Sequence, residues 1–444
     1  MMRALLPAIG LSVVGIACFP GDETVDVFTE EEWEIIEQFA LTEPPPSNPT
    51  NMYEDDLAAA ELGQMLFFEK GYAGGIQVPN DGSNGGLGTV GMTGETGKVA
   101  CADCHDPARY YTDGRSNPNA LSLGVRWTGR NAPSLVNVNY YIWGNWAGAH
   151  PWMWKQGAGG PESGANFSGN RLQFVHLLYR KYRDVYDAIF PVPLDPALDP
   201  EALDADRFPP SGKPKSAGAP DGPWEMMAAE DRAIVNRIMA NVGKALEAYE
   251  RRLISQNAPI DRYIAGDHDA LSPAAKRGLR LFIGKAACVD CHSGPIFSDQ
   301  QFHNIGVPQD SFRTDLGRYE DLPKALGSTF NGTGALSDDP EAGEAKLAGL
   351  EPTEDMIGQF RTASLRHIAE TGPYMHNGSL ATLEDVVRFY NWGGGTANYP
   401  GVKHPAIVPL GLTQREEADL VEFLKSLTGE PPPAELGEDT AIHD

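Results

Sequence analysis

Residues 271–292 read LSPAAKRGLRLFIGKAACVDCH, an amphipathic segment that runs into the motif CVDCH at 288–292. Its apolar residues recur at helical spacing, which predicts a helix directly before the motif. An earlier stretch has the same order, because AAAELGQMLFFEKG at 58–71 precedes CADCH at 101–105. This weak internal repeat predicts two copies of one helical unit. Beyond short loops no strand-rich pattern occurs, so the predicted fold class is mainly α.

The spacing C-x-x-C-H has a chemical explanation. Two thiols at this spacing add across the vinyl groups of a haem, and the adjacent His is brought to the iron as its proximal ligand. A zinc site would need both motifs to cooperate and would leave one His over, and a disulfide or redox pair would not need the His twice. We therefore predict two cytochrome c-like haem domains packed together with long loops, each with a covalently bound haem c. The predicted attachment residues are Cys101, Cys104, Cys288 and Cys291, and the predicted iron ligands are His105 and His292.

The overall charge limits the partners. Among 444 residues there are 35 Lys+Arg and 61 Asp+Glu, a formal net charge of −26. A nucleic-acid-binding protein needs a basic surface, so nucleic acid is not an expected partner. An acidic protein attracts cationic partners instead, although a negative surface also serves solubility alone.

The first 18 residues have the pattern of an export signal. A short start with Arg3 precedes an apolar run from Ala4 to Ile16 that is too short to span a bilayer. The sequence GIAC, ending at Cys18, is similar to a bacterial lipobox, with Gly three positions before the Cys. We therefore predict a periplasmic protein anchored to a membrane by a lipid on Cys18; the alternative is that this Cys is incidental.

The chain divides into five predicted segments. Residues 1–18 are the signal, and 19–54 are an acidic extension and linker, with a helix near Glu30–Ala40, that serves as a flexible spacer. The predicted N-terminal domain covers 55–262, the C-terminal domain covers 263–430, and an acidic tail covers 431–444.

Several motifs in order resemble the bacterial di-haem cytochrome c peroxidases, which include the MauG-type enzymes of methylamine utilisation. The resemblance covers about residues 55–427 and is carried by CADCHDPARYYTDGR, GRNAPSLVNV, VNRIMANVGKALEAYERRL, the second haem motif with its surroundings, and FRTASLRHIAETGPYMHNGSLATLEDVVRFYNWGG. It implies a periplasmic protein with two α-helical c-type domains, a calcium ion between them, and peroxide chemistry at the N-terminal haem.

The resemblance also implies ligands on the far side of each iron. At the second haem, Tyr390 falls where the peroxidases have Met and the MauG-type enzymes have Tyr, and Met375 is a rival ligand. A phenolate lowers the iron potential relative to a thioether. At the first haem, no His occurs between His105 and His150, which implies an open sixth position; ligation by His150 is the alternative.

Other site residues follow from the resemblance alone. Trp154, or next Trp152, matches the tryptophan that relays electrons between the haems. The usual Gln and the Glu that shuttles protons are not placed cleanly, and Gln156 and Glu162 are the candidates, with Pro161 at a family proline. The resemblance assigns calcium to Asn131, Thr371 and Pro373, as oxygen ligation suits Ca²⁺.

The predicted function is reduction of H2O2 to water with electrons from a small c-type cytochrome or cupredoxin. One alternative is a MauG-like oxidase that uses a high-valent iron state on a protein or organic substrate, which Tyr390 favours. The other is a di-haem electron carrier without peroxide turnover, which the uncertain proton-shuttling acid favours.

Overall fold

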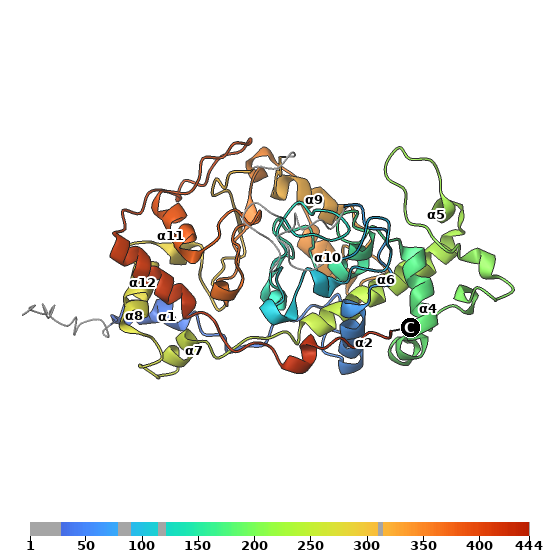
Figure 1. Cartoon of the computed structure of the whole chain (residues 1–444), viewed down its shortest axis with the longest axis horizontal. Helices are drawn as coiled ribbons and strands as arrows, with labels where there is room; N and C mark the ends of the chain where they lie inside the picture. Colours follow the sequence, from blue (N-terminus) through green and yellow to red (C-terminus); the bar gives the residue numbers. More distant parts are fainter. Residues whose placement is uncertain (1–27, 79–89, 114–120, 310–313, 444) are drawn as a thin grey trace, which may run out of the picture.

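The computed structural model describes residues 28–78, 90–113, 121–309 and 314–443. The predicted signal and Cys18 lie outside this part of the chain. Many of its helices gather toward the two ends of an elongated molecule, and long loops with a few short helices lie between them (Figure 1). The mainly α prediction is confirmed, since the described residues contain only two strands, β1 (Phe302–His303) and β2 (Phe360–Arg361), paired antiparallel.

Two large hydrophobic cores underlie the two groups of helices. The first core holds Cys101 at its edge and the second holds Cys288. In the N-terminal half the helices are α1 (Glu30–Glu37), α2 (Leu57–Phe68), α3 (Trp154–Gly159), α4 (Arg171–Ile189), α5 (Pro223–Met226) and α6 (Ala229–Glu250). In the C-terminal half they are α7 (Pro259–Ile264), α8 (Pro273–Ile283), α9 (Arg318–Leu326), α10 (Pro340–Leu347), α11 (Leu383–Asn391) and α12 (Gln414–Lys425).

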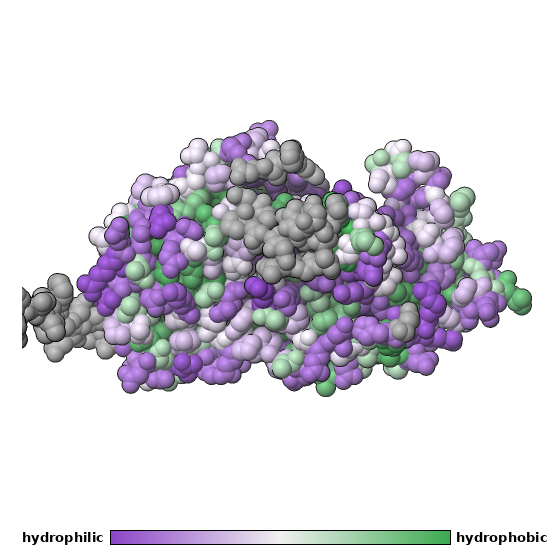
Figure 2. Space-filling view, in the orientation of Figure 1, coloured by the Kyte–Doolittle hydropathy of each residue, from purple (hydrophilic) through white to green (hydrophobic). Residues whose placement is uncertain are grey.

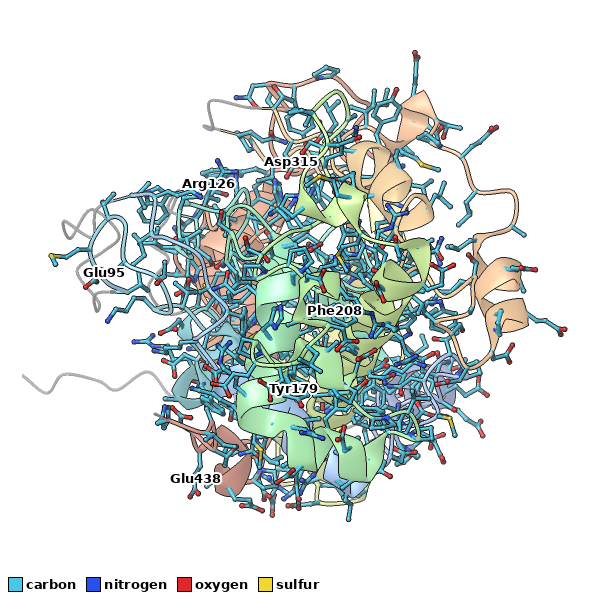
Figure 3. The ribbon with its side chains drawn as sticks, turned by 90° about the vertical axis from the view of Figure 1, so that its right-hand side faces the viewer. Glu95, Arg126, Tyr179, Phe208, Asp315 and Glu438 are labelled. Carbon is cyan, nitrogen blue, oxygen red and sulfur yellow. The ribbon has the colours of Figure 1, made fainter. Side chains whose placement is uncertain are left out.

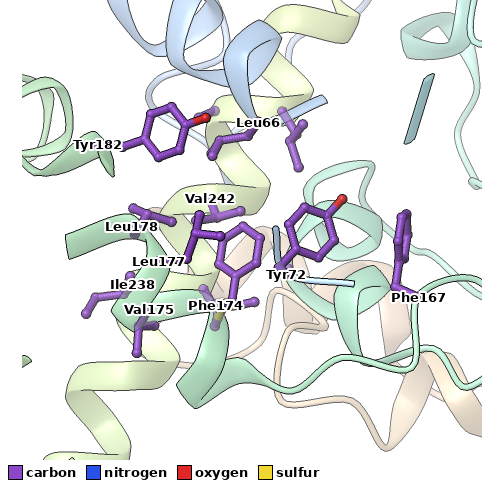
Figure 4. Packing of buried hydrophobic residues seen from close by; sticks show 14 of the residues in the cluster. Leu66, Tyr72, Phe167, Phe174, Val175, Leu177, Leu178, Tyr182, Ile238 and Val242 are labelled. Atoms are coloured by element: carbon purple, nitrogen blue, oxygen red, sulfur yellow. The ribbon is translucent and has the colours of Figure 1, made fainter. Parts of the chain in front are cut away.

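The first core is rich in aromatic side chains. Tyr72 packs against Phe174 of α4 with ring centroids 4.7 Å apart, and Leu66 of α2 lies in the same cluster (Figure 4). The outer face is mostly hydrophilic in the view of Figure 2, in keeping with the charged composition. None of the helices in the described residues is long and apolar enough to cross a membrane.

A pair of closely crossing helices occurs in each core. In the first, a side chain on Gly63 of α2 would collide with the carbonyl of Ala245 in α6. In the second, a side chain on Gly278 of α8 would collide with the carbonyl of Asp419 in α12. Glycine allows the two backbones to approach, and the crossing repeats with the same residue type in both cores.

Aromatic pairs next to the two crossings repeat as well. The rings of Phe67 and Tyr249 lie 5.2 Å apart, and those of Phe282 and Phe423 lie 5.1 Å apart. The internal repeat that the sequence indicated is therefore present as a repeated packing arrangement.

Residues 28–54 of the N-terminal extension are packed along the molecule rather than forming the flexible spacer expected from composition. Ile36 and Phe39 are fully buried in the second core, and Phe39 stacks on Phe297 at 4.5 Å. The chain then continues to the first core, where Asn48 and Asn51 bind α6. Burial of these apolar side chains stabilises the extension, which composition alone did not indicate.

The C-terminal tail follows the second half of the chain in sequence but packs on the first core. Leu436 is buried there, and its carbonyl accepts a hydrogen bond of 2.6 Å from the Tyr249 hydroxyl. The carbonyl of Glu438 accepts one from Gln64 of α2. In the view of Figure 3, Glu438 lies near the lower edge and Asp315 lies in the upper part of the molecule. Each end of the described chain therefore crosses to the core formed by the other half.

Candidate active site

The first C-x-x-C-H motif forms a tight turn on the wall of a cavity. Residues Cys101–Asp103 make one turn of 3-10 helix, which the carboxylate of Asp103 caps by accepting from the Ala100 amide at 2.7 Å. The amide of His105 then bonds to the carbonyl of Cys101 at 2.9 Å. Both thiols and the imidazole consequently line one cavity of about 740 Å³.

Each motif histidine is oriented by a backbone carbonyl. The Nδ1 of His105 lies 3.0 Å from the carbonyl of Tyr111, and the Nδ1 of His292 lies 2.9 Å from that of Phe297. A carbonyl can only accept, so Nδ1 carries the proton and Nε2 is left for a metal. Burial lowers the pKa of both histidines, which keeps them neutral and able to ligate.

The surroundings of the first motif fit a porphyrin. The volume of the cavity beside this motif lies within the range of roughly 300–1,000 Å³ found for cofactor sites. Apolar side chains form part of the wall, including Leu66, Phe67 and Leu246. Burial raises the pKa of the Cys101 thiol to about 12, so the free group is a neutral thiol at physiological pH. The two motifs lie in separate cores, which removes the zinc alternative because that site required them to act together.

Two of the residues predicted around the peroxide site line this cavity. Gln156 of α3 and Pro161 both do. Glu162 does not line it: both carboxylate oxygens are bound by the guanidinium of Arg171, at 2.7 and 2.8 Å. The structure therefore separates Glu162 from Gln156 and holds it in an ion pair.

The predicted relay tryptophans occupy different surroundings. Trp154 is fully buried between α3 and α6, does not line the cavity, and donates to the hydroxyl of Thr50 at 2.9 Å. Trp152 stacks against the ammonium of Lys346 at 3.8 Å. Trp146, which the sequence reading did not single out, lines the cavity and donates to the carbonyl of Asn131 at 2.7 Å.

A repeated loop provides the signal that could have found Trp146. Gly144 bridges to His150 in the first half, as Tyr374 bridges to Leu380 in the second. At the same sequence spacing, Trp146 corresponds to His376 of the PYMHNG motif. A comparison of the chain with itself would therefore have placed Trp146 beside the first haem motif.

The same register extends to the position that the resemblance places on the far side of the second iron. Asn145 and Met375 both have left-handed backbones, with φ of 67° and 72°, and so do Gly148 and Gly378. Continued at this spacing, the counterpart of Tyr390 is Gly160, which has no side chain and lines the first cavity. A position that offers a phenol in the second copy offers no ligand in the first.

Tyr390 lies close to the second motif. Burial raises its pKa, and the nearby Cys288 and Cys291 sulfurs act in the same direction. Met375 lies on the loop before α11 with only part of its surface exposed. His376 stacks on Phe360 with ring centroids 3.7 Å apart, and burial lowers its pKa to about 3. Of the two predicted ligands, Tyr390 is therefore the one that lies near the sulfurs of the second motif.

His150 lines the first cavity beside a lysine. Its Nδ1 lies 3.3 Å from the Nζ of Lys155. Burial, followed by the charges of Lys155, Arg130 and Lys324, lowers the pKa of His150 well below its usual value. The imidazole is therefore neutral at physiological pH.

Charged residues from the second half of the chain close the cavity. Arg130, on the cavity wall, forms ion pairs of 2.6 Å with Asp315 and with Asp321 of α9. The cavity thus lies between the two halves rather than within one.

Two of the predicted calcium residues, Asn131 and Pro373, meet at this junction. The amide Nδ2 of Asn131 donates to the carbonyl of Pro373 at 2.9 Å, and the backbone amide of Asn131 donates to His376. Thr371 lies two residues before Pro373. The amide and carbonyl oxygens here are of the type that Ca²⁺ prefers.

The repeated helix crossings, the two C-x-x-C-H turns and the carbonyl-oriented histidines define a c-type cytochrome with two haem-binding motifs. The family model for di-haem cytochrome c peroxidases matches residues 57–269. The cytochrome-c peroxidase IdrP1 of Denitromonas iodatirespirans is 34% identical over 402 residues, which cover 87% of this chain and 85% of that protein. The chain therefore belongs to the di-haem cytochrome c peroxidase family.

Other relatives cover both branches of the predicted family. The methylamine utilization protein MauG of Methylorubrum extorquens is 28% identical over 337 residues, 75% of this chain and 73% of that protein. Among solved structures, a MauG-like protein associated with microbial copper homeostasis matches with a TM-score of 0.59 and 24% identity, covering 90% of this chain and 97% of that one. The family implies two c-type haems and makes the chain an oxidoreductase that acts on peroxide.

Proposed function

We propose that this protein reduces H2O2 to water at the first haem site, with electrons from a small periplasmic c-type cytochrome or cupredoxin that reach the second haem site. The observation that carries the proposal is the pairing of Gly160 with Tyr390 in the repeat, which leaves the first site without a side-chain ligand at the position of Tyr390. A haem held by Cys101, Cys104 and His105, and a second held by Cys288, Cys291 and His292, would supply the redox-active iron for this reaction.

The side chains of the first cavity define the surroundings of peroxide. His105, held by Tyr111, fixes the proximal side, and the amide of Gln156 lies on α3 next to Gly160. Neutral His150 beside Lys155 offers one N–H donor and one acceptor nitrogen without a positive charge of its own. Pro161 fills the wall and helps to exclude water.

A set of hydrogen bonds joins the first cavity to the loop before α11. Trp146 donates to Asn131, whose amide donates to the carbonyl of His376, directly after Met375. This path supports Trp146 as the electron relay. Trp154, which the resemblance pointed to, remains a prediction that a direct comparison of variants can test.

Tyr390 favours a second candidate function. A phenolate at the second iron lowers its potential, which suits withdrawal of electrons from a protein or organic substrate, as proposed for a MauG-like oxidase. A pure electron carrier would need no open site, so the Gly160 position argues against it.

Steady-state assays separate these functions. The holoprotein, with two haems per chain confirmed by pyridine haemochrome, is mixed with H2O2 and a reduced small c-type cytochrome. The proposal expects two cytochromes oxidised per H2O2 consumed. No consumption would identify an electron carrier, and consumption with oxidation of another protein but not of the cytochrome would favour the oxidase.

Export and anchoring at Cys18 belong to the same proposal. Labelling with a fatty acid analogue and loss of the label in a Cys18→Ala variant would support the lipid anchor.

A further inference from the structure

Reduction of one H2O2 to two waters takes up two electrons and two protons. The electrons come from the donor, but the protons must be delivered into a buried cavity. Both oxygens of Glu162, the carboxylate that the resemblance suggested, are bound by Arg171, and its side chain does not line the cavity. Another acid on the cavity wall is therefore required if the proposed function holds.

Glu250 at the C-terminal end of α6 is such an acid. It lines the cavity together with Cys101, and Leu246, one turn earlier, meets Gly157 of α3. Within the described residues, its carboxylate has no hydrogen-bond or ion-pair partner. Helix α6 thus presents an unpaired carboxyl to the space that a haem bound at Cys101 would share.

A second carboxyl lies one turn earlier on the same helix. Glu247 is 2% exposed and accepts hydrogen bonds from the amide of Asn48 at 2.8 and 2.9 Å and from Asn51 at 2.7 Å. Both asparagines belong to the packed N-terminal extension. This extension therefore encloses Glu247 and shields it from bulk water.

A third carboxyl connects this pair to the surface. Glu54 accepts from the backbone amide of Asn48 at 2.7 Å and forms an ion pair of 3.2 Å with Arg251. Its side chain is 12% exposed, and its charge acts on Glu247. Glu54, Glu247 and Glu250 thus form a row from the protein surface to the cavity.

The second copy of the helix provides an internal control. The crossings pair Ala245 with Asp419, so the counterparts of Glu247 and Glu250 in α12 are Val421 and Leu424. The same helix packing is achieved there with apolar side chains. Buried carboxyls cost free energy unless they are neutral or well bonded, so the fold does not account for their presence in the first copy.

The electrostatic surroundings keep the pKa of both acids in the range that suits a proton donor near neutral pH. Burial, with a further contribution from Glu247, raises the pKa of Glu250 to about 8. Burial raises the pKa of Glu247 to about 7. The hydrogen bonds from Asn51 and Asn48 and the charge of Arg251 oppose this rise, and the charge of Glu54 adds to it. Lys346 also faces Glu247, and the Cys101 thiol, which haem attachment would convert to a neutral thioether, faces Glu250.

We propose that Glu250 delivers protons to the peroxide site and is reprotonated through Glu247 and Glu54. This inference rests on the proposed function. Two deliveries serve each peroxide: one protonates the oxygen released when the O–O bond breaks, the other protonates the remaining oxygen, and in each Glu250 becomes a carboxylate. It then takes a proton from Glu247, which is resupplied from solvent past Glu54, while both electrons come from the cytochrome or cupredoxin.

The test compares Glu250→Gln, which keeps shape but cannot ionise, with Glu230→Gln, an exposed position on the same helix. Haem content and melting temperature establish that each variant is loaded and folded. We expect the single-turnover reaction of Glu250→Gln with H2O2 to slow by about 100-fold at pH 7, at the lower end of general acid–base effects. The wild-type rate should fall as pH rises through about 8, where Glu250 loses its proton, and this fall should vanish in the variant.

A spectroscopic readout is independent of turnover. The infrared pH-difference spectrum of the holoprotein should contain a protonated carboxyl band that titrates near pH 8 and is absent from Glu250→Gln. Glu250→Asp should restore part of the rate. A wild-type rate and pH profile in Glu250→Gln, or a loss confined to Glu162→Gln, would overturn the inference while leaving peroxidase activity intact. Failure of the wild type to consume H2O2 would remove the proposed function itself.

Discussion

Asn131 and Pro373 are 242 residues apart in the chain, yet the amide of Asn131 donates a buried hydrogen bond of 2.9 Å to the Pro373 carbonyl. The contact joins the loop after the first haem motif to the loop before α11 of the second site. The same asparagine accepts from Trp146 through its carbonyl. The two haem sites are thereby linked through one residue.

We expect a calcium ion to strengthen this junction, with the Asn131 amide turned so that its oxygen faces the ion. At 100 times its dissociation constant, Ca²⁺ would add about 2.7 kcal/mol to the stability. Metal analysis of the holoprotein and thermal unfolding with and without a chelator measure this. Asn131→Ala should abolish the calcium-dependent rise in melting temperature, and Mg²⁺ should not replace Ca²⁺. An equal melting temperature with and without calcium would contradict the assignment.

The ion pairs of Arg130 predict that removing its charge will strongly lower the free energy of unfolding. Arg130→Met removes the ion-pair partner of Asp315 and leaves buried Asp321 with Lys324 alone, and breaking a buried pair costs about 3–5 kcal/mol. Arg388→Met, which breaks an exposed pair with Asp385, should cost less than about 1 kcal/mol and serves as the control. Denaturant unfolding measures both. Equal effects would show that the junction does not depend on Arg130.

Asp315 adds a pH dependence to the same junction. Burial alone would raise its pKa, but the hydrogen bond and charge of Arg130 outweigh burial and lower it below the ordinary value of 3.8. The stabilisation is therefore complete above about pH 4 and is lost as pH falls through the lower native pKa. Acid unfolding of Asp315→Asn should show less of this dependence than the wild type.

The two rival ligands of the second haem can be separated spectroscopically. If Tyr390 binds the iron, Tyr390→Phe removes the phenol oxygen and should change the low-spin EPR signal of the ferric protein. Met375→Leu should leave that signal unchanged. The reverse pattern would identify Met375 as the ligand.

The sequence was sufficient for features whose chemistry is local. The C-x-x-C-H spacing, with Cys and His within five residues, carries the haem prediction, and the helical periodicity around Gly63 and Gly278 carries the mainly α fold. Features that depend on distant partners could not be predicted. Glu162 was a candidate acid until the structure placed Arg171 against it, and Phe39 looked like part of a spacer because its partner Phe297 lies far along the chain.

The packed N-terminal extension predicts a measurable contribution to stability. Phe39→Ala removes a fully buried ring from the second core and should lower the free energy of unfolding by about 3–5 kcal/mol. Leu203→Ala, at a fully exposed position, should have little effect. Denaturant unfolding of the holoprotein compares them. Equal stability of the two variants would mean that the extension is not held by this contact.

Trp146 and Trp154 make different predictions for electron transfer between the haems. Trp146 lines the first cavity and bonds to the junction residue Asn131, whereas Trp154 is enclosed between α3 and α6 and bonds to Thr50. Trp146→Phe should therefore slow reoxidation of the second haem after peroxide is added, by at least about tenfold, without changing the rate at which peroxide binds. Trp154→Phe should lower stability by about 1 kcal/mol through the lost hydrogen bond and leave electron transfer unchanged. Stopped-flow spectra of the half-reduced protein measure both steps, and slower transfer in Trp154→Phe alone would assign the relay to Trp154.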